Sequence, residues 1–301
     1  MDTFLQQLVN GLVMGCMYAM VALGYTMVYG IIGMINFAHG EVLMVGAMVA
    51  WTLITAMQDA GSTLPGWLQL VIGMGGAVAV CAFLNFSIER IAYRPLRNAP
   101  RLAPLITAIG MSVLLQALAM VIWKPTPKPF PNVLPLEIYE VHGAIITSTH
   151  LLIFAVTGAL LGGLLWLVHK TSLGRAMRAT AENPKVAALM GVRPDRVISS
   201  TFVIGAVLAA VTGILWAMNY GTAQHSMGFL PGLKAFTAAV LGGIGNLGGA
   251  VLGGILLGLI EAFGSGYLSS RYVDVLAFVT LIVVLTMRPS GLLGERVADR
   301  A

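Results

Sequence analysis

The chain has 301 residues, of which 58% are hydrophobic and only 10% are charged, and its mean hydropathy is +0.88. A soluble domain carries roughly 25% charged residues, so this composition excludes a globule with a polar surface and indicates a protein whose solvent is mostly lipid. The formal net charge of +5 is explained by basic cytoplasmic loops, which are typical of membrane proteins.

The apolar runs predict an all-α fold, a polytopic integral membrane helical bundle. A helix needs about 20 apolar residues to cross a bilayer, and the sequence lacks the short alternating segments of a β-barrel. We expect one transmembrane domain over residues 1–301, with about eight spans and broken helices. The expected spans are residues 6–30, 41–57, 67–88, 102–123, 150–169, 198–218, 234–264 and 272–288.

The first polar interruption is GIIGMINFAHGE at residues 30–41. Asn36, His39 and Glu41 are polar groups in an otherwise apolar region. An ionised carboxylate at mid-membrane costs about 2.5–3.5 kcal/mol on insertion scales, so such groups usually line a cavity or pair with a partner. The stretch equally fits a hydrated turn at the cytoplasmic end of two spans, and the sequence leaves both interpretations open.

The basic residues predict the orientation of the chain. Most of the 17 Lys and Arg residues fall in the loops 89–101 and 170–197 and in the tail that begins at residue 288. The positive-inside rule places all three segments in the cytoplasm. The neutral, proline-rich loop 124–149 then lies outside, and three crossings before residue 89 place the N-terminus outside as well.

The cytoplasmic loop 170–197 contains a short predicted helix. Asn183 is a favourable N-cap, Pro184 suits the first helical position, and Gly191 suits the position after the end. The apolar side of this helix is formed by Val186, Ala187, Leu189 and Met190. Such a helix either lies on the membrane surface or docks into a groove of a cytoplasmic partner.

The span 234–264 is interrupted by GGIGNLGG at residues 242–249 and forms either one tilted helix or two half-helices. Gly245, Gly249 and Gly253 are four residues apart and predict close helix packing. The same spacing occurs at Gly11 and Gly15, and again at residues 158 and 162.

The glycines at residues 243–248 also match G-x-G-x-x-G, but they lie in an apolar run rather than between a strand and a helix, which argues against a dinucleotide site. A break at this point would expose backbone groups to a water-filled path.

Motifs for chemistry are absent from the sequence. Neither a GxxxxGK[ST] phosphate loop nor an HExxH zinc motif occurs, and Cys16 and Cys81 are too isolated for a disulfide framework or a zinc site. We therefore expect no catalytic residue, metal, cofactor or nucleic-acid partner, and a chain that is not an enzyme. An ion-coupled secondary transporter is the rival class, but only Glu41 and Glu261 could serve as its coupling-ion ligands.

Several motifs together resemble one family over nearly the whole chain, the LivH-type permease of branched-chain amino acid ABC importers. The segments that carry the resemblance are INFAHGE (35–41), YRPLR (93–97), RLAPLI (101–106), GRAMR (174–178), AALMG (187–191), residues 236–254 and RPSGLLG (288–294).

The resemblance implies an importer of the bacterial plasma (inner) membrane. Its other parts would be a LivM-like second permease subunit, two cytoplasmic ATPase subunits that hydrolyse ATP, and a periplasmic substrate-binding protein. Related permeases carry amides, urea or other amino acids, so the substrate is open. We expect no charged cluster inside the membrane, because a path that releases its solute should bind it weakly.

The resemblance implies that the loop 174–191 is the cytoplasmic coupling region, and a transport mechanism of this kind also needs residues that line the path. The polar path is expected to include Asn36, His39, Glu41, Thr237 and Asn246. The ATPase contact is expected to include Arg175, Arg178, Asn183, Val186, Ala187, Ala188, Leu189, Met190 and Gly191. This region is only loosely like the EAA loop of other ABC importers, because the Glu of that loop is missing here.

Overall fold

The computed structural model describes residues 2–97, 99–100, 102–141, 143–288 and 290–294, and it confirms an all-α membrane bundle. Within these residues, eight helical segments are long and apolar enough to cross a membrane. The helices are α1 (Asp2–Ile32), α2 (His39–Asp59), α3 (Gly66–Ile88), α4 (Leu102–Trp123), α5 (Ser148–Lys170), α6 (Ser172–Glu182), α7 (Pro184–Leu189), α8 (Pro194–Tyr220), α9 (Phe229–Gly242), α10 (Leu247–Tyr267) and α11 (Val273–Met287). Three short helical turns complete the set, the π-helical η1 (Glu89–Tyr93) and the 3₁₀ turns η2 (Arg94–Leu96) and η3 (Ser270–Tyr272).

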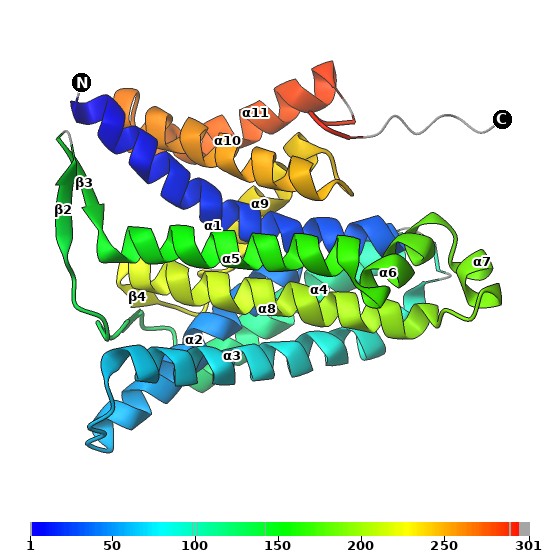
Figure 1. Ribbon diagram of the computed structural model, residues 1–301, viewed down its shortest axis with the longest axis horizontal. Coiled ribbons are helices and arrows are strands. Elements are labelled where there is room, and N and C mark those ends of the chain that lie inside the picture. Colours follow the sequence, from blue (N-terminus) through cyan, green and yellow to red (C-terminus); the bar gives the residue numbers. More distant parts are fainter. Residues whose placement is uncertain (1, 98, 101, 142, 289, 295–301) are drawn as a thin grey trace.

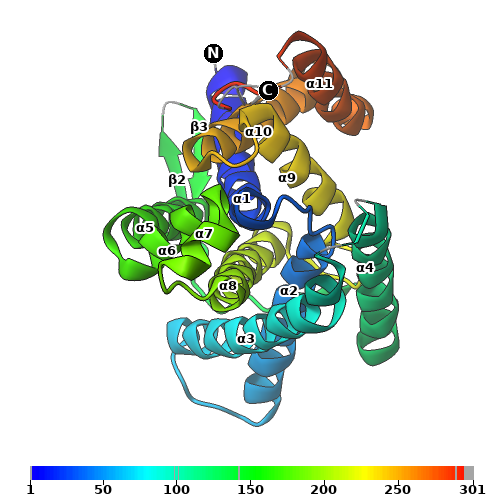
Figure 2. The same ribbon diagram turned by 90° about the vertical axis from the view of Figure 1, so that its right-hand side faces the viewer.

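The helix α1 lies at the centre of the bundle. In its most apolar stretch 83% of the residues are buried, against 6% for the segment that contains α11. Viewed along the bundle, α1 and α8 lie inside, while α3, α4, α5 and α11 lie at the periphery (Figure 2). The peripheral helices expose apolar side chains, which is the pattern of helices that face lipid.

The basic loop 170–197 and the neutral loop 124–149 lie at opposite ends of the bundle. The helices α6 and α7 extend from one end, and the strands β2 and β3 lie at the other (Figure 1). By the positive-inside rule we expect the end with α6 and α7 to face the cytoplasm, so we call it the cytoplasmic end and the opposite end the outer end. The helix α11 ends at Met287, and the last described segment of the chain is residues 290–294.

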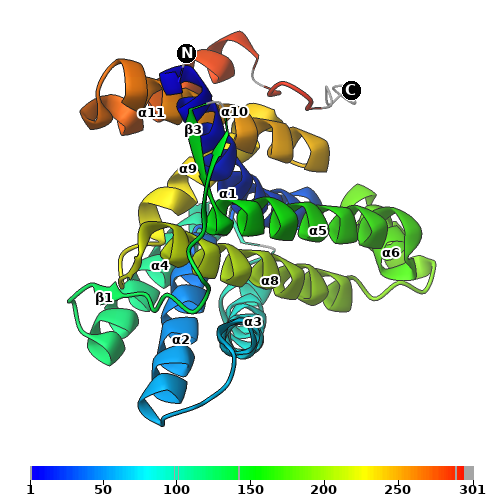
Figure 3. The ribbon, with the colours of Figure 1, turned by 60° about the vertical axis from the view of Figure 1, so that its left-hand side comes forward.

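The outer end carries two small sheets that the sequence does not predict. The strands are β1 (Lys128–Pro129), β2 (Ile138–Val141), β3 (Ala144–Thr147) and β4 (Thr222–Ala223). The antiparallel pairs are β1 with β4 and β2 with β3 (Figure 3). The first pair joins the connection between α4 and α5 to the end of α8. The indole of Trp51 donates a hydrogen bond of 2.9 Å to the carbonyl of Pro129, which ties the same connection to α2.

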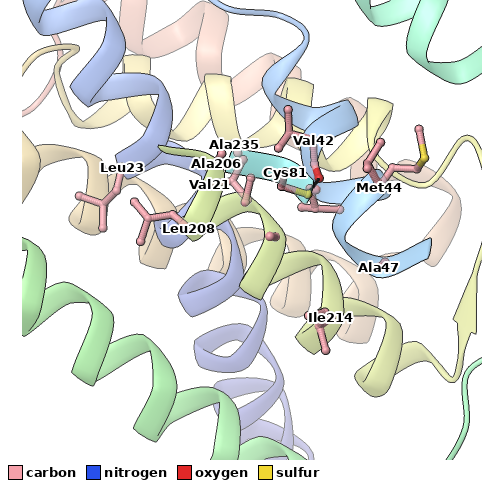
Figure 4. Packing of buried hydrophobic residues seen from close by; sticks show 14 of the residues in the cluster. Val21, Leu23, Val42, Met44, Ala47, Cys81, Ala206, Leu208, Ile214 and Ala235 are labelled. Atoms are coloured by element: carbon pink, nitrogen blue, oxygen red, sulfur yellow. Dashed lines mark hydrogen bonds between the residues drawn. The ribbon is translucent and has the colours of Figure 1, made fainter. Parts of the chain in front are cut away.

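The core is built from many alanines and from Val, Leu, Ile and Met side chains of α1, α2, α3, α8 and α9. Val21, Val42, Ala206 and Ala235 lie close together in it (Figure 4). The thiol of the buried Cys81 lies 3.4 Å from the carbonyl oxygen of Val42. Small residues let helix backbones approach each other closely, which is the main source of helix association in lipid.

The most extensive helix contact joins α1 to α10. A Cβ added at Gly15 would lie 2.7 Å from the Cα of Ile255, and one added at Gly258 would lie 2.5 Å from the carbonyl oxygen of Gly11. Both neighbours are backbone atoms, so neither can give way to a side chain. On α5, a Cβ at Gly158 or Gly162 would meet nothing within 4 Å, so these glycines pack against no described residue of this chain.

The predicted interruption near residue 243 divides the segment into two helices, α9 and α10. Gly243 and Gly245 have φ angles of 106° and 100°, which favour glycine. In α10, a Cβ at Gly249 or Gly253 would lie 2.9 or 2.8 Å from backbone atoms of Gly242, so these two glycines let α9 and α10 pack closely. Gly245 does not extend this stripe, because it precedes α10 and a Cβ there would meet nothing within 4 Å.

Replacing Gly258 with Ala should destabilise the bundle. The added methyl group would clash with the backbone of α1, and overpacking of this kind costs about 1–3 kcal/mol. The matched control is Gly75→Ala, at a helical position where a Cβ meets nothing within 4 Å. We expect the melting temperature in detergent to fall for Gly258→Ala and to stay or rise for Gly75→Ala, and equal melting temperatures would contradict this packing.

Candidate solute cavity and coupling surface

A cavity of about 380 Å³ lies in the outer half of the bundle, where α1, α8, α9, α10 and the connection between α8 and α9 meet. Its size falls within the range of roughly 300–1,000 Å³ that is typical of small-molecule sites. The residues that line it are Met14, Tyr18, Trp216, Tyr220, Thr222, Gln224, Ser226, Met227, Leu230, Pro231, Lys234, Glu261 and Val273. We call this space the outer cavity.

Three charged side chains meet at the wall of the outer cavity. The ammonium group of Lys234 lies 3.0 Å from a carboxylate oxygen of Glu261 and 2.7 Å from one of Asp274. The hydroxyl of Tyr18 donates a hydrogen bond of 2.8 Å to the other oxygen of Glu261. These contacts join α1, α9, α10 and α11. We call Tyr18, Lys234, Glu261 and Asp274 the charged cluster.

Two of the three charged side chains in the charged cluster are buried, so their charges need partners. The side chain of Glu261 is 0% exposed and that of Lys234 is 10% exposed, whereas Asp274 is 55% exposed. An unpaired charge at this depth would carry a desolvation cost of several kcal/mol, and ionisable residues inside the membrane usually mark a solute or ion path. The expectation that the membrane contains no charged cluster is therefore wrong.

The rest of the outer cavity is largely apolar and aromatic. Trp216 stacks on Tyr220 with ring centroids 5.2 Å apart and lies 5.7 Å from the ring of Tyr18. Met227 and Leu230 complete an apolar wall. A cavity with one ionic corner and apolar walls can hold a small solute that carries both charges and a hydrocarbon group.

A second cavity of about 320 Å³ continues from the outer cavity toward the outer end. It shares Met14, Tyr220 and Glu261 with the outer cavity and adds Gln7 and Asn10 from the first turns of α1. Together the two spaces connect the charged cluster to the outer end of the bundle.

The five predicted path residues do not gather around the outer cavity. Thr237 is buried, and its hydroxyl donates to the carbonyl of Leu233 in its own helix. Asn246 is the N-cap of α10: its side chain accepts from the backbone of Gly249 and donates to the carbonyl of Leu293, at 3.0 and 2.9 Å. Asn246 does line a cavity of about 560 Å³ at the cytoplasmic end.

Asn36 belongs to a buried chain of hydrogen bonds between helices. The hydroxyl of Tyr93 donates to its side-chain oxygen over 2.9 Å, and its amide donates to Asn85 over 3.5 Å. Asn85 in turn donates to the carbonyl of Phe202 over 2.6 Å. This chain satisfies polar groups at the break between α1 and α2 and links the break to α3 and α8.

His39 and Glu41 lie in the first turn of α2, inside the bundle rather than in a hydrated turn. The ring of His39 fits a slot at Gly24, where a Cβ would lie 2.5 Å from its Cε1 atom, and it meets the ring of Tyr25 edge-on at 5.0 Å. Glu41 accepts hydrogen bonds of 3.0 and 2.8 Å from Ser112 and Gln116 of α4. Both residues therefore contribute to helix packing.

Sequence reasoning missed three members of the charged cluster. The predicted span 234–264 begins at Lys234, whereas α9 begins five residues earlier, and no role is predicted for this lysine from the sequence. A Lys inside an apolar run is itself a signal of a functional site. Tyr18 and Asp274 give no comparable signal, because only the packing of α1 and α11 brings them to Glu261.

The predicted short helix is α7, and its cap is confirmed. The side chain of Asn183 accepts hydrogen bonds of 3.0 and 3.2 Å from the backbone of Lys185 and Val186. Gly191 follows the helix with a φ of 86°.

The apolar side chains of α7 divide into two groups. Leu189 and Met190 are 86% and 81% exposed and Val186 is 53% exposed, whereas Ala187 is 3% exposed. Ala188 is exposed as well. Only Ala187 faces the protein, so α7 presents an unpartnered apolar surface at the cytoplasmic end.

The helix α6, which leads into α7, packs against the end of α5. The guanidinium of Arg178 donates to the carbonyl of Val168 near the end of α5, so this residue stabilises the turn between the two helices. Gly174 allows the same close approach, since a Cβ there would lie 2.5 Å from the carbonyl carbon of Val168. Arg175 is exposed, with no ion-pair partner among the described residues.

An ionic network ties the segment after α7 to the end of α3. Arg97 contacts both the fully buried carboxylate of Glu89 and that of Asp195, the second residue of α8. Arg94 lies 3.4 Å from Asp195, and Ser199 donates to Glu89 over 2.7 Å. The network therefore joins the first turns of α8, which begins five residues after α7 ends, to η1 and η2.

Among the described residues, no group of three or more His, Cys, Asp or Glu side chains is placed to hold a metal ion. The charged cluster contains a Lys and two carboxylates, and it forms ion pairs rather than a set of metal ligands.

Residues 7–285 match the family described as "Branched-chain amino acid transport system / permease component". The high-affinity branched-chain amino acid transport system permease protein BraD of Pseudomonas aeruginosa is 49% identical over 297 residues, which are 97% of this chain and 96% of that relative. The corresponding permease protein LivH of Escherichia coli K12 is 47% identical over 296 residues, again 97% of this chain and 96% of that relative.

Among solved structures, PsaBC from Streptococcus pneumoniae in complex with Fab aligns with 96% of this chain and 91% of that chain at a TM-score of 0.46 and 14% identity, a likeness too weak to show the fold. The family match and the two relatives cover nearly the whole chain. The chain therefore belongs to the permease components of branched-chain amino acid transport systems, and it is a multi-pass membrane subunit of an ABC importer rather than an enzyme.

Proposed function

We propose that this permease forms the translocation path for branched-chain amino acids, that the outer cavity is the entrance of the path, and that α7 receives the driving force from cytoplasmic ATPases. The observation that carries the proposal is the charged cluster at the wall of an otherwise apolar cavity. The names of the relatives from P. aeruginosa and E. coli support this class of substrate.

The chemistry of the outer cavity suits an aliphatic amino acid. The substrate carboxylate would approach Lys234, and its ammonium group would approach Glu261 and Asp274, which already lie 3.0 and 2.7 Å from the lysine. The branched side chain would contact Trp216 and Met227. Urea and short amides carry no net charges to pair, so the charged cluster favours the amino acid.

The charged cluster also limits how tightly the solute can bind. Its charges are already paired with one another, so a substrate exchanges one set of ion pairs for another instead of gaining a new set. Weak binding of this kind is what a path needs, because a tightly held solute would leave slowly.

The exposed surface of α7 supports docking of a cytoplasmic partner. Val186, Leu189 and Met190 would enter a groove in an ATPase subunit, in the manner of an amphipathic helix. The whole chain would act as one permease domain with the coupling loop 170–197. Motion of α7 would pass through Asp195 into α8, whose outer half carries Trp216.

The remaining parts of the importer are inferred from the family. A LivM-like second permease subunit would complete the path across the bilayer, two ATPase subunits would bind at the cytoplasmic end, and a periplasmic substrate-binding protein would deliver the solute at the outer end. In this arrangement the chain would lie in the inner membrane of a bacterium.

Removing one charge of the charged cluster should abolish uptake. Lys234→Met leaves Glu261 buried without its closest cation, and such a loss costs roughly 3–5 kcal/mol, so folded yield should fall with transport. The double variant Lys234→Met/Glu261→Met removes both buried charges and should fold better than the single variant. We expect it to insert normally and yet reduce ATP-dependent leucine uptake in liposomes by more than about tenfold, since a lost charge pair exceeds 1.4 kcal/mol.

The matched control for this experiment is Lys124→Met/Glu140→Met, which makes the same change at exposed positions of the outer end. This control should transport like the wild type. Normal leucine uptake by a well-folded Lys234→Met/Glu261→Met variant would rule out the outer cavity as the solute path.

Acidic substitutions on α7 should uncouple the permease from its ATPases. Val186→Asp and Met190→Asp place charges on the exposed apolar surface of α7. Folding does not depend on these two side chains, so both variants should still insert into the membrane. Co-purification of the ATPase subunits and leucine transport should both fall. Val141→Asp, at an exposed apolar position of β2, is the control for a charge at the other end, and unchanged transport by the α7 variants would exclude the docking role.

A further inference from the structure

A groove of about 670 Å³ opens at the cytoplasmic end between α3, α5, α6 and α8, away from both the outer cavity and the exposed surface of α7. The charged part of its lining is Arg90, Arg94 and Arg196. The apolar part includes Phe86 of α3 and Val203 and Ile204 of α8. We call this space the arginine groove.

Two of the three arginines are free to bind a ligand. Arg94 already lies 3.7 Å from Glu89 and 3.4 Å from Asp195. Arg90 and Arg196 are exposed, and neither has an ion-pair partner in the part of the chain that the structure describes. The groove therefore holds uncompensated positive charge.

The charge and the apolar wall lie at the depths that an amphiphile requires. Arg196 is in the first turn of α8, and Val203 is seven residues further along, about 10 Å deeper at 1.5 Å per residue. On α3, Phe86 likewise precedes Arg90 by about one turn toward the membrane interior. The positive charge is thus at the level of the headgroups and the apolar wall at the level of the acyl chains.

We propose that the arginine groove binds an anionic phospholipid of the cytoplasmic leaflet, with its phosphate between Arg90 and Arg196 and one acyl chain along Phe86, Val203 and Ile204. Basic pockets between helices on the cytoplasmic side are suited to anionic headgroups. A planar guanidinium pairs with phosphate through two parallel hydrogen bonds. A free phosphate would use only the arginine end and would leave the apolar wall uncovered.

Such a lipid would bridge α3 and α8 beside the ionic network of Glu89, Arg97 and Asp195. This network holds the start of α8, the helix that follows α7 along the chain. A bound lipid would brace this joint, so its chemical identity would affect the stability of the assembled importer.

The test compares lipid retention by the assembled importer in detergent, measured by native mass spectrometry and by melting temperature. Phosphatidylglycerol and phosphatidylcholine with identical acyl chains are added in turn. We expect phosphatidylglycerol to be retained and to raise the melting temperature, and phosphatidylcholine to do neither. The variant Arg90→Gln/Arg196→Gln should reduce retention of phosphatidylglycerol by about tenfold or more.

Two further variants control for the loss of positive charge and for misfolding. Lys124→Gln/Arg271→Gln removes two exposed charges at the outer end and should bind phosphatidylglycerol like the wild type. If the double arginine variant fails to fold, Val203→Trp offers a second test. It narrows the groove at its apolar wall, keeps every charge and should lower the retention of phosphatidylglycerol.

Three results would overturn the proposal. One is equal retention of the two lipids by the wild type. Another is full retention of phosphatidylglycerol by a folded Arg90→Gln/Arg196→Gln variant. The third is displacement of the lipid by inorganic phosphate or glycerol phosphate at equal concentration, which would show that the groove takes a free phosphate.

Discussion

The bilayer core supplies no water to backbone groups, so every interruption of a helix must be satisfied inside the protein. Two interruptions meet at the cytoplasmic end, where a Cβ at Gly30 would lie 3.5 Å from the Cα of Gly245. Asn246 caps α10, and the backbone nitrogens of Leu292 and Leu293 donate to carbonyls at the end of α9. The C-terminal segment thereby seals the break. The helix α9 therefore ends at Gly242, inside the protein, with its last carbonyls satisfied.

One continuous helix connects the two regions that the proposed mechanism needs. The helix α8 has 27 residues and spans about 40 Å at 1.5 Å per residue. Its first turn is held by the ionic network through Asp195, and its last turns supply Trp216 and Tyr220 to the outer cavity. Coupling between distant sites requires an element whose state both sites influence. The helix α8 satisfies this requirement geometrically, because it touches both sites.

Features that depend on neighbouring residues could be predicted from the sequence, whereas features that depend on contacts between distant helices could not. The cap at Asn183 and the break near Gly243 depend on neighbouring residues, so both could be predicted. The positions of Asn36 and Glu41 depend on α3 and α4, which supply Asn85 and Ser112 as partners across more than forty residues of sequence. The charged cluster is the extreme case, since Glu261 and Asp274 reach Lys234 only when α10 and α11 fold back onto α9.

The central claim is that the outer cavity admits a zwitterionic aliphatic solute and that ATP hydrolysed by other subunits drives it inward. The most direct measurement is uptake by the assembled importer in liposomes, with labelled leucine compared against labelled urea and a short amide. The proposed function predicts that leucine accumulates only when ATP and the ATPase subunits are present, and that urea and the amide do not accumulate. Uptake by this chain alone without ATP, or equal uptake of the amide, would contradict it.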